Sequence, residues 1–562
     1  MANIKITELT ELSTPVTTDI LEIVSAPATT PVSKKITLAN LRSPSATTVA
    51  PGVIEIATNA EAIAGTDAAR AVTPDDLKYV LDKRIQQFYG VAWDEAADTY
   101  ARTGSTAGQA TGVTLADAFL PIQRRMRRCI LTDAGVVAYY LSATDSTKKE
   151  DGVTASVLDG TDGQVMVEIP KFWFRHTYVG TTHTWEVSAV PLAGFSVYPA
   201  FLSGTTEYDY IYRSAYEANL YDVSATLYNG QCYQTAVSAV FATADDSITI
   251  ATRTGWATNL TVGQKLVISG TVSNNGTFTV ATIKSATAIT TTENLTDETA
   301  AATVIQAQTD VTATTGDKLS SVSGVLPITG GSANGTRAHF RTWAANRGAG
   351  WSQMLWDVHS AIQLLYLTEY ADWYSQDVLG YGIAAVGDWA AYNDYNPIAK
   401  TGNSNVVGNT TGCTATSAIT TGAGAKDVYL SYRGIENPFG HVWKWVDGIN
   451  TNNNRSYVCN VLANLADDTA ANYTDIGVNN INESGYQGTL LDIDRGFLPK
   501  ALTDGSSTAK ITDYYYQAAG WRVTVSGGDA NYGAIVGVAC LILNNASGYV
   551  DRNIGGALVF RG

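Results

Sequence analysis

The sequence predicts an α+β protein of several domains that is rich in short strands and poor in helices. The chain has 562 residues, which leaves room for three or four modules at roughly 100–200 residues per domain. Short aromatic runs bounded by turn residues recur from Phe88 onward, as in the segment 167–174 (VEIPKFWF), and such runs are typical of strands. The clearest helical spacing of apolar residues lies at 337–347 and 353–372. We expect the second of these helices to lie against a sheet.

The composition excludes several classes of partner. Lys plus Arg is 36 and Asp plus Glu is 52, so the formal net charge is −16, and only 16% of residues are charged. Nucleic acids and anionic lipids are bound through a basic surface, which this chain lacks. With 45% hydrophobic residues, 12 Trp and 30 Tyr, the chain is also too apolar to be disordered throughout. We therefore expect a globular protein that binds no nucleic acid and inserts into no membrane.

The cysteines and the N-terminus indicate assembly in a reducing compartment. The five cysteines are scattered and never form a CxxC pair, which favours neither a disulfide framework nor a zinc ribbon. The first residues lack a basic segment followed by an apolar one, so no secretory signal is expected. The apolar run 533–543 is too short to span a bilayer and is typical of a buried or half-buried strand.

The N-terminal part is predicted to be an attachment segment followed by a shaft. Residues 1–48 hold short apolar clusters too small to bury a core, and they end in a linker. Residues 49–87 combine a strand-like run with two helix starts, at Thr58 and at Thr73-Pro74. Their core, GVIEIATNAEAIAGTDAARAVTPDDL, resembles the repeat of tailed-phage tail fibres. That resemblance implies part of a trimeric shaft.

A change in composition divides the rest of the chain into a head and an insert. Residues 88–235 and 309–562 are aromatic and form the two parts of the head. Residues 236–308 are rich in Thr, Ala and Val and alternate apolar with polar positions, with Asn274-Asn275-Gly276 as a hairpin turn. This pattern predicts a small β-sandwich or barrel, which we assign as a β-sandwich. A binding role and a spacer role are both open for it.

No catalytic or metal-binding residue is predicted. The sequence has no HExxH, no phosphate-binding GxxxxGK[ST] and no GxSxG motif. Asp492 and Asp494 would share one face of a strand, but such pairs are common and indicate little about acid–base chemistry. The acids Asp357, Glu369 and Asp447 are interpreted as surface or structural residues. No cofactor is expected.

The head contains a series of motifs that together resemble one family. Among them are PLAGFSVYPAF, ENPFGHVWKWVDGIN, YYYQAAGWRVTVSGG and NNASGYVDRNIGGALVFRG. In this order they resemble the C-type-lectin-type domain of phage and prophage tail proteins that retroelements diversify, the major tropism determinant type. This implies a C-type-lectin-like head, a fold shared with formylglycine-generating enzymes. Cys459 and Cys540 lie far apart in the sequence, so the chemistry of those enzymes is not implied.

The resemblance also implies a variable surface near the C-terminus, within about 520–562. Aligning the family's GG…NNxS…RNIGG frame with this chain gives ten candidate receptor-binding positions: Asp529, Asn531, Tyr532, Ile535, Ala539, Cys540, Ile542, Gly548, Tyr549 and Asp551. Four of them (Ile535, Ala539, Cys540 and Ile542) could equally be buried strand residues. The two tyrosines are the stronger candidates, because Tyr offers contact area at low entropic cost.

A surface that tolerates exchange needs a scaffold that carries the stability, since truncation in a core costs about 2–5 kcal/mol. The proposed scaffold residues are Trp443, Trp445, Trp521, Gly527, Gly528, Gly555 and Gly556. The tryptophans supply buried area and the glycines allow tight turns.

These observations predict a non-enzymatic adhesin in the virion tail of a phage or prophage, made in the host cytoplasm. We expect it to bind a bacterial surface receptor, protein or glycan, to attach to tail or baseplate proteins, and to form a homotrimer. Two alternatives stay open: a tail-associated glycan depolymerase and a purely structural virion protein.

Overall fold

The computed structural model describes residues 20–25, 32–37, 88–331, 334–385, 397–415, 428–479 and 483–562. The chain divides into two units, Met1–Gln86 and Gln87–Gly562. In the first unit the described residues form an antiparallel hairpin of β1 (Ile20–Ser25) and β2 (Val32–Thr37). The tail-fibre repeat predicted at 49–87 lies outside the described residues.

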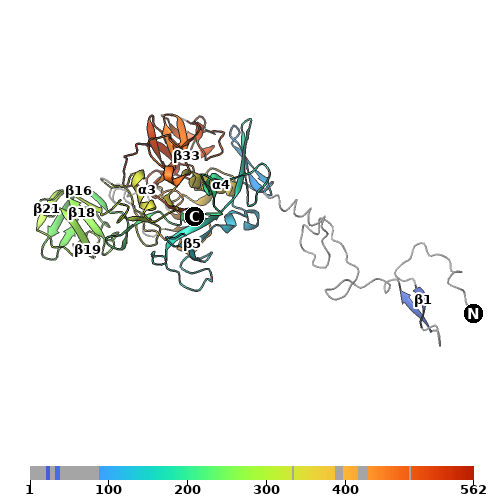
Figure 1. Cartoon of the computed structure of the whole chain (residues 1–562), viewed down its shortest axis with the longest axis horizontal. Coiled ribbons are helices and arrows are strands. Elements are labelled where there is room, and N and C mark those ends of the chain that lie inside the picture. The colour runs from blue at the N-terminus through green and yellow to red at the C-terminus, as the bar shows by residue number, and fades with distance from the viewer. Residues whose placement is uncertain are drawn as a thin grey trace, which may run out of the picture. The chain divides into compact units, whose positions relative to one another are not determined.

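The second unit is predominantly β, with few helices (Figure 1). It begins with an antiparallel five-stranded sheet in the order β10-β8-β9-β3-β4. Its strands are β3 (Phe88–Asp94), β4 (Thr99–Gly104), β8 (Trp173–Val179), β9 (Thr182–Ser188) and β10 (Ser196–Val197). The aromatic run 167–174 contributes to two strands and not one, because Pro170 ends the first of them.

A six-stranded antiparallel sheet brings the end of the chain into the middle of the head. Its order is β23-β37-β13-β7-β5-β6. The strands are β5 (Arg127–Leu131), β6 (Val137–Tyr140), β7 (Gln164–Pro170), β13 (Tyr210–Ser214), β23 (Trp351–Gln353) and β37 (Leu558–Phe560). The C-terminal strand β37 lies between β13 and β23. The polypeptide just before β37 is therefore anchored at its C-terminal end by two neighbouring strands.

The insert is a closed barrel, in the order β16-β17-β20-β19-β18-β21. The strands are β16 (Tyr233–Ala242), β17 (Ser247–Thr249), β18 (Lys265–Ser269), β19 (Gly276–Ser285), β20 (Ala288–Thr291) and β21 (Glu298–Ala307). The assignment as a β-sandwich was wrong, because β21 pairs with both β16 and β18 and so closes the sheet. Alternation of apolar and polar residues is the same in both architectures.

A small sheet connects the barrel to the head. It has the order β15-β14-β22 and consists of β14 (Asn219–Asp222), β15 (Leu227–Asn229) and β22 (Lys318–Ser320). The barrel begins shortly after β15 and ends shortly before β22, so it is inserted between two strands of one sheet. In Figure 1 the barrel is the green region labelled β16, β18, β19 and β21.

Three α-helices lie among the described residues of the second unit: α3 (Arg337–Ala345), α4 (Trp356–Tyr370) and α5 (Ser375–Leu379). The first begins with a capping box, in which the Thr336 hydroxyl accepts from the backbone N–H of His339 at 3.2 Å. The helix α4 contacts β3, β9 and β27, in agreement with the expected packing on a sheet. No helix of the described residues is both long and apolar enough to cross a membrane.

The C-terminal part folds into a large sheet with the path β29-β28-β27-β34-β35-β33-β30, and β36 pairs with β27 beside this path. Its strands are β27 (Trp443–Asn452), β28 (Arg455–Val458), β29 (Thr474–Val478), β30 (Ser484–Gln487), β33 (Ile511–Gln517), β34 (Trp521–Ser526), β35 (Leu541–Asn545) and β36 (Ile554–Gly555). The short remaining strands are β11 (Leu202–Ser203), β12 (Thr206–Glu207), β24 (Gly412–Ala415), β25 (Val428–Tyr432), β26 (Ile435–Glu436), β31 (Thr489–Leu490) and β32 (Pro499–Ala501).

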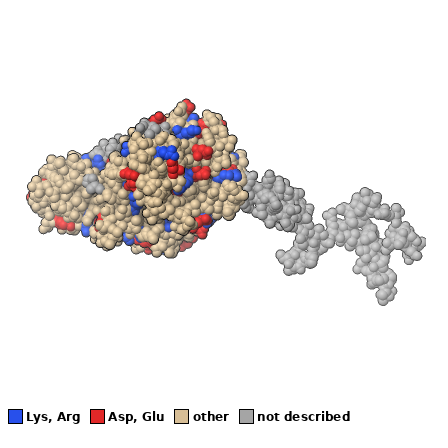
Figure 2. All heavy atoms as spheres, turned by 45° about the horizontal axis from the view of Figure 1, so that its top comes forward, with Lys and Arg blue, Asp and Glu red and all other residues tan. Residues whose placement is uncertain are grey.

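Few residues of the chain are charged, 16% in all. On the face drawn in Figure 2, basic and acidic groups are interspersed and most atoms belong to uncharged residues. No broad basic area is visible on this face. The five cysteines are free.

Candidate binding surface

The ten candidate positions lie between the end of β34 and the start of β36, and the structure separates them by exposure. Asn531, Tyr532, Gly548 and Tyr549 are exposed, and Ile535, Ile542 and Asp551 are partly exposed. Asp529, Ala539 and Cys540 are buried. Whether any of the ten contacts a receptor stays a prediction.

The three buried residues need a correction, because a sealed side chain cannot contact a ligand. Ala539 and Cys540 lead into β35, which lies between β34 and β33 inside the sheet. The backbone N–H of Ala539 donates to the buried carboxylate of Asp513 at 2.6 Å, and burial raises the pKa of the Cys540 thiol well above its usual value. These residues belong to the scaffold beneath the surface. Both are buried as the alternative expected, but they lie in the turn before β35 and not on the strand itself.

Four of the remaining residues lie together, and we call Asn531, Tyr532, Tyr549 and Asp551 the tyrosine surface. Tyr532 and Tyr549 are each 41% exposed. The Tyr549 hydroxyl donates to the Asp551 carboxylate at 2.8 Å. Burial, this hydrogen bond and the nearby Tyr532 raise the pKa of Tyr549 to about 12. The phenol is protonated at neutral pH and donates its hydrogen bond to Asp551 there.

Tyr532 rests on the scaffold through an aromatic contact. Its ring stands edge-on to that of the buried Trp443, with the ring centroids 5.2 Å apart and an interplanar angle of 83°. This T-shaped arrangement is a favourable one for two aromatic rings. Ile542, in contrast, packs against a core cluster that contains Trp443 and Val525, and is not part of the tyrosine surface.

Asp529 holds the turn that presents Asn531 and Tyr532. Its carboxylate accepts from the backbone N–H of Asn531 at 2.9 Å and from the side-chain amide of Asn553 at 2.8 Å. Burial raises the pKa of Asp529 to about 6, although these hydrogen bonds and one from Trp443 lower it. The buried Asp529 carboxylate thus fixes the turn that carries Asn531 and Tyr532.

A buried polar cluster lies under the same turn. Glu217 forms an ion pair with Lys444 at 2.8 Å and accepts a hydrogen bond from Nδ1 of His441 at 2.5 Å, and all three side chains are at most 2% exposed. Burial alone would raise the pKa of Glu217, but Lys444 and His441 lower it to about 2. Burial in turn lowers the pKa of Lys444, against the opposing effect of Glu217.

His441 connects this cluster to three loops. Its Nε2 accepts from the backbone N–H groups of Ile398 and Ala399, both at 3.2 Å. Its carbonyl accepts from the N–H of Ala530 at 3.1 Å, and its own N–H donates to Ile383 at 2.6 Å. His441 has a left-handed backbone (φ 63°), which is rare for residues other than glycine. Sequence reasoning missed this arrangement, because Glu217 and Lys444 lie on distant segments.

The proposed scaffold residues lie mainly beneath the surface. Trp443 and Trp445 are buried, and the Trp445 indole donates to the carbonyl of Gly335 at 3.0 Å. Trp521 is partly exposed and packs beside Tyr457.

The proposed glycines occupy positions where a side chain would collide with a neighbour or strain the backbone. At Gly528 (φ 79°), a Cβ would lie 2.4 Å from a methyl group of Val536. At Gly556 it would lie 2.7 Å from the ring of Phe340. Gly527 also has a left-handed backbone (φ 89°), and a Cβ at Gly555 would approach the carbonyl of Ile328 to 2.9 Å.

The acids considered as candidates are structural. Each is buried and ion-paired: Asp357 with Arg495 at 2.5 Å, Glu369 with Arg433 at 2.6 Å, and Asp447 with Arg341 at 2.6 Å. Of the two alternatives, a surface residue or a structural one, the structural one holds for all three, because arginines on distant segments pair with them inside the fold.

Asp492 and Asp494 lie near a pair of histidines, in a loop and not on a strand. Nδ1 of His176 is 3.8 Å from Asp492 and 3.4 Å from Asp494, and its Nε2 is 3.0 Å from Nδ1 of His183. Burial, followed by the nearby His176, lowers the pKa of His183 to about 3. The described residues contain no group of three or more His, Cys, Asp or Glu that could hold a metal ion.

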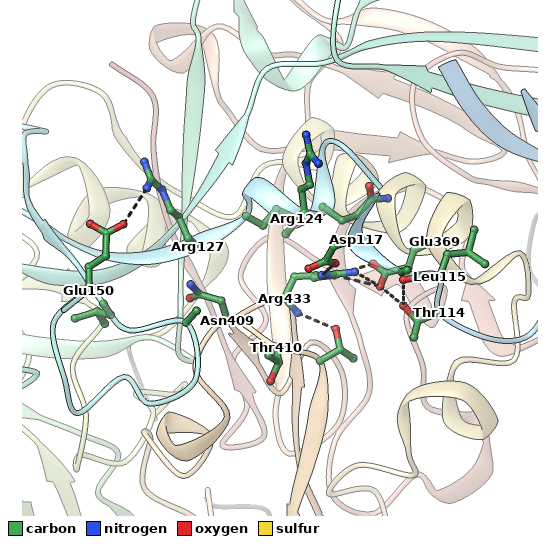
Figure 3. Close-up of a pocket in the computed structure, with 16 residues that line it drawn as sticks. Thr114, Leu115, Asp117, Arg124, Arg127, Glu150, Glu369, Asn409, Thr410 and Arg433 are labelled. Atoms are coloured by element: carbon green, nitrogen blue, oxygen red, sulfur yellow. Dashed lines mark hydrogen bonds and ion pairs between the residues drawn. The ribbon is translucent and has the colours of Figure 1, made fainter. Parts of the chain in front are cut away.

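A separate pocket of about 570 Å³ is shown in Figure 3, and none of the ten candidates lines it. At its centre Arg433 bridges Glu369 and Asp117, at 2.6 and 2.8 Å, and the Thr114 hydroxyl donates to Glu369 at 2.8 Å. Arg124 points away from this group in Figure 3. Arg433 joins two carboxylates from distant segments, and these contacts support the fold at this point.

The chain matches no protein-family model and no curated protein. Among solved structures it is similar to the Major Tropism Determinant U1 variant, at 14% sequence identity and a TM-score of 0.20, over 43% of this chain and 46% of that one. It is also similar to the Major Tropism Determinant P3c variant, at 10% identity and a TM-score of 0.23, over 84% of this chain and 72% of that one. Similarity at this level carries no argument about function.

Proposed function

We propose that this protein is an adhesin of a phage or prophage tail, with a C-type-lectin-type head that binds a bacterial surface receptor through the tyrosine surface. The observation that carries the proposal is the contrast between Tyr532 and Tyr549, which are exposed, and the buried residues that fix them. Asp529 holds the turn of Asn531, and Trp443 supports the ring of Tyr532. Exposed aromatic side chains on a rigid base are typical of binding surfaces.

The sequence motifs support the same proposal independently. They place the tyrosine surface in the part of the chain that varies in the family they resemble. We expect that side chains at these positions can be exchanged with little effect on the core. At Gly548 a Cβ would have no heavy atom within 4 Å, and the Tyr549 hydroxyl bonds to Asp551 in its own loop. We expect a homotrimer whose several heads bind together, since linked weak sites gain overall affinity.

The test is binding of the labelled full chain to a panel of bacterial strains, compared with a variant carrying Tyr532→Ala and Tyr549→Ala. We expect binding to a recognised strain to fall by at least about tenfold, as truncation of central interface aromatics usually does. The melting temperature should change little.

Tyr486→Ala is the matched control. Tyr486 is partly exposed on β30 and stands edge-on to Tyr514, with centroids 5.5 Å apart and an angle of 84°, so it loses a comparable aromatic contact. It should leave cell binding unchanged. Equal binding by the double variant and the parent would contradict the proposal. Release of reducing sugar from the cells would favour the depolymerase alternative.

A further inference from the structure

A second cavity, of about 740 Å³, lies between the small sheet β15-β14-β22 and the loops around 132–133 and 159–164. None of the tyrosine-surface residues lines it. Its size falls in the range of small-ligand sites.

The sheet presents a row of three side chains to this cavity. Tyr221 on β14 pairs in register with Tyr228 on β15 and with Lys318 on β22. Residues directly opposite on antiparallel strands project to the same face, so the three side chains form a row. Leu220, the next residue along β14, is fully buried in a core cluster on the other face. The tyrosine rings are 4.8 Å apart and inclined by 54°.

The ring of Tyr228 is fixed in place. Its hydroxyl donates to the carbonyl of Gly160 at 3.2 Å and accepts from the side-chain amide of Gln164 at 3.3 Å. A Cβ at Gly160 would lie 2.2 Å from this hydroxyl, so the loop approaches the ring as closely as a glycine permits. For the neighbouring Tyr221, which is partly exposed, the described residues provide no hydrogen bond to the hydroxyl. One aromatic ring is thus rigid and the other is available for contact.

The charges around the cavity leave carboxylate acceptors in excess. Asp133 is ion-paired with Lys318 at 3.3 Å and with Arg347. Within the part of the chain that the structure describes, Asp159 and Asp162 have no ion-pair partner. Asp162 accepts one hydrogen bond, from Tyr139 at 2.8 Å. An ionised carboxylate has about four acceptor positions, so both acids can accept more.

We propose that this cavity binds a neutral saccharide. The apolar face of a sugar ring would pack on Tyr221, where C–H groups meet the electron-rich face of an aromatic ring. Hydroxyl groups would donate to Asp159 and Asp162, and Lys318 would donate to ring or hydroxyl oxygens. Anionic sugars are disfavoured, because Asp159 and Asp162, which have no ion-pair partner among the described residues, would repel them. The inference does not depend on the proposed role of the tyrosine surface.

The probe is an array of neutral and acidic oligosaccharides from bacterial surfaces, read with the labelled full chain. We expect binding to at least one neutral oligosaccharide, with dissociation constants then measured for that compound. Tyr221→Ala should weaken this binding by about tenfold, the loss typical of a truncated aromatic contact. Tyr221→Phe, which keeps the ring, should bind within about threefold of the parent.

Further variants make the result decisive. Asp159→Asn removes an acceptor charge without removing volume and should also weaken binding. Tyr486→Ala, which loses an aromatic contact outside both sites, should leave saccharide binding unchanged. Binding that is lost in Tyr549→Ala but kept in Tyr221→Ala would assign the saccharide to the tyrosine surface and overturn this proposal. The proposal would be overturned by an array on which no neutral compound binds, by binding restricted to acidic compounds, or by equal affinity of Tyr221→Ala and the parent.

Discussion

The buried ring of Trp443 meets the exposed ring of Tyr532 edge-on, with centroids 5.2 Å apart. Trp443 is 3% exposed and Tyr532 is 41% exposed, so this contact joins the core to the surface within one pair of residues. Truncating the two residues should therefore have different effects. Loss of the Trp443 side chain should lower the stability of the fold, whereas loss of the Tyr532 side chain should weaken binding.

We expect Trp443→Ala to lower the free energy of unfolding by about 3–5 kcal/mol, because it opens a cavity beneath the sheet. Tyr532→Ala should cost only about 1 kcal/mol, the value of an aromatic pair at a partly exposed position. Urea unfolding of both variants measures the difference. Equal losses would mean that Tyr532 belongs to the core.

The glycines allow a similar comparison. Gly528→Ala places a methyl group 2.4 Å from Val536 on a left-handed backbone, and should destabilise the protein by about 1–3 kcal/mol. Gly548→Ala enters open space, since no heavy atom lies within 4 Å of its Cβ position, and should change stability by less than about 0.5 kcal/mol. Thermal melting of the two variants tests this. A large loss at Gly548 would contradict its assignment to the surface.

The ion pair of Glu217 and Lys444 should be costly to break. Glu217→Gln leaves the Lys444 ammonium buried without a compensating charge, which typically costs about 3–5 kcal/mol. Asp209→Asn is the control, because Asp209 is 78% exposed where it meets Lys171, and exposed pairs contribute about 0–1 kcal/mol. Chemical unfolding at pH 7 compares them. If both variants lost equally little stability, the cluster of Glu217, Lys444 and His441 would not support the turn that presents Asn531.

Asp513 should make stability depend on pH. Burial raises the pKa of this carboxyl to about 7, against an opposing hydrogen bond from Ala539, while in the unfolded chain it titrates near 3.8. The folded state therefore holds this proton more tightly, and the resulting stability is present below about pH 4 and lost as the pH rises through about 7.

Asp513→Asn mimics the protonated form at every pH. Relative to the parent, the variant should gain stability between pH 5 and pH 8, on the order of 2–4 kcal/mol. The free energy of unfolding of variant and parent is measured at pH 5 and at pH 8, and the difference between the two proteins is compared at the two pH values. A difference that is the same at both values would contradict the raised pKa.

The sequence predicted the helices well but not their surroundings. Apolar spacing located α3 and α4 to within a few residues. It could not reveal that Glu369 is buried, because its partner Arg433 lies on a distant segment. Alternation likewise identified the strands of the insert, but only the pairing of β21 with both β16 and β18 distinguishes a barrel from a sandwich.

The candidate surface was predicted in a similar, partial way. Residue type correctly indicated that Tyr532 and Tyr549 are exposed. The same reasoning fails for Asp529, because aspartates are usually exposed and this one is buried. Its burial depends on hydrogen bonds to Asn531 and Asn553 and on Trp443, none of which a single sequence displays.

The most direct test is to randomise Asn531, Tyr532, Gly548 and Tyr549 together and to measure, for each variant, the melting temperature and binding to the strain panel. We predict that most variants melt within a few degrees of the parent, as surface substitutions usually do, while strain recognition changes from variant to variant. Widespread unfolding, or recognition that stays constant across folded variants, would contradict a binding surface that is separate from the core.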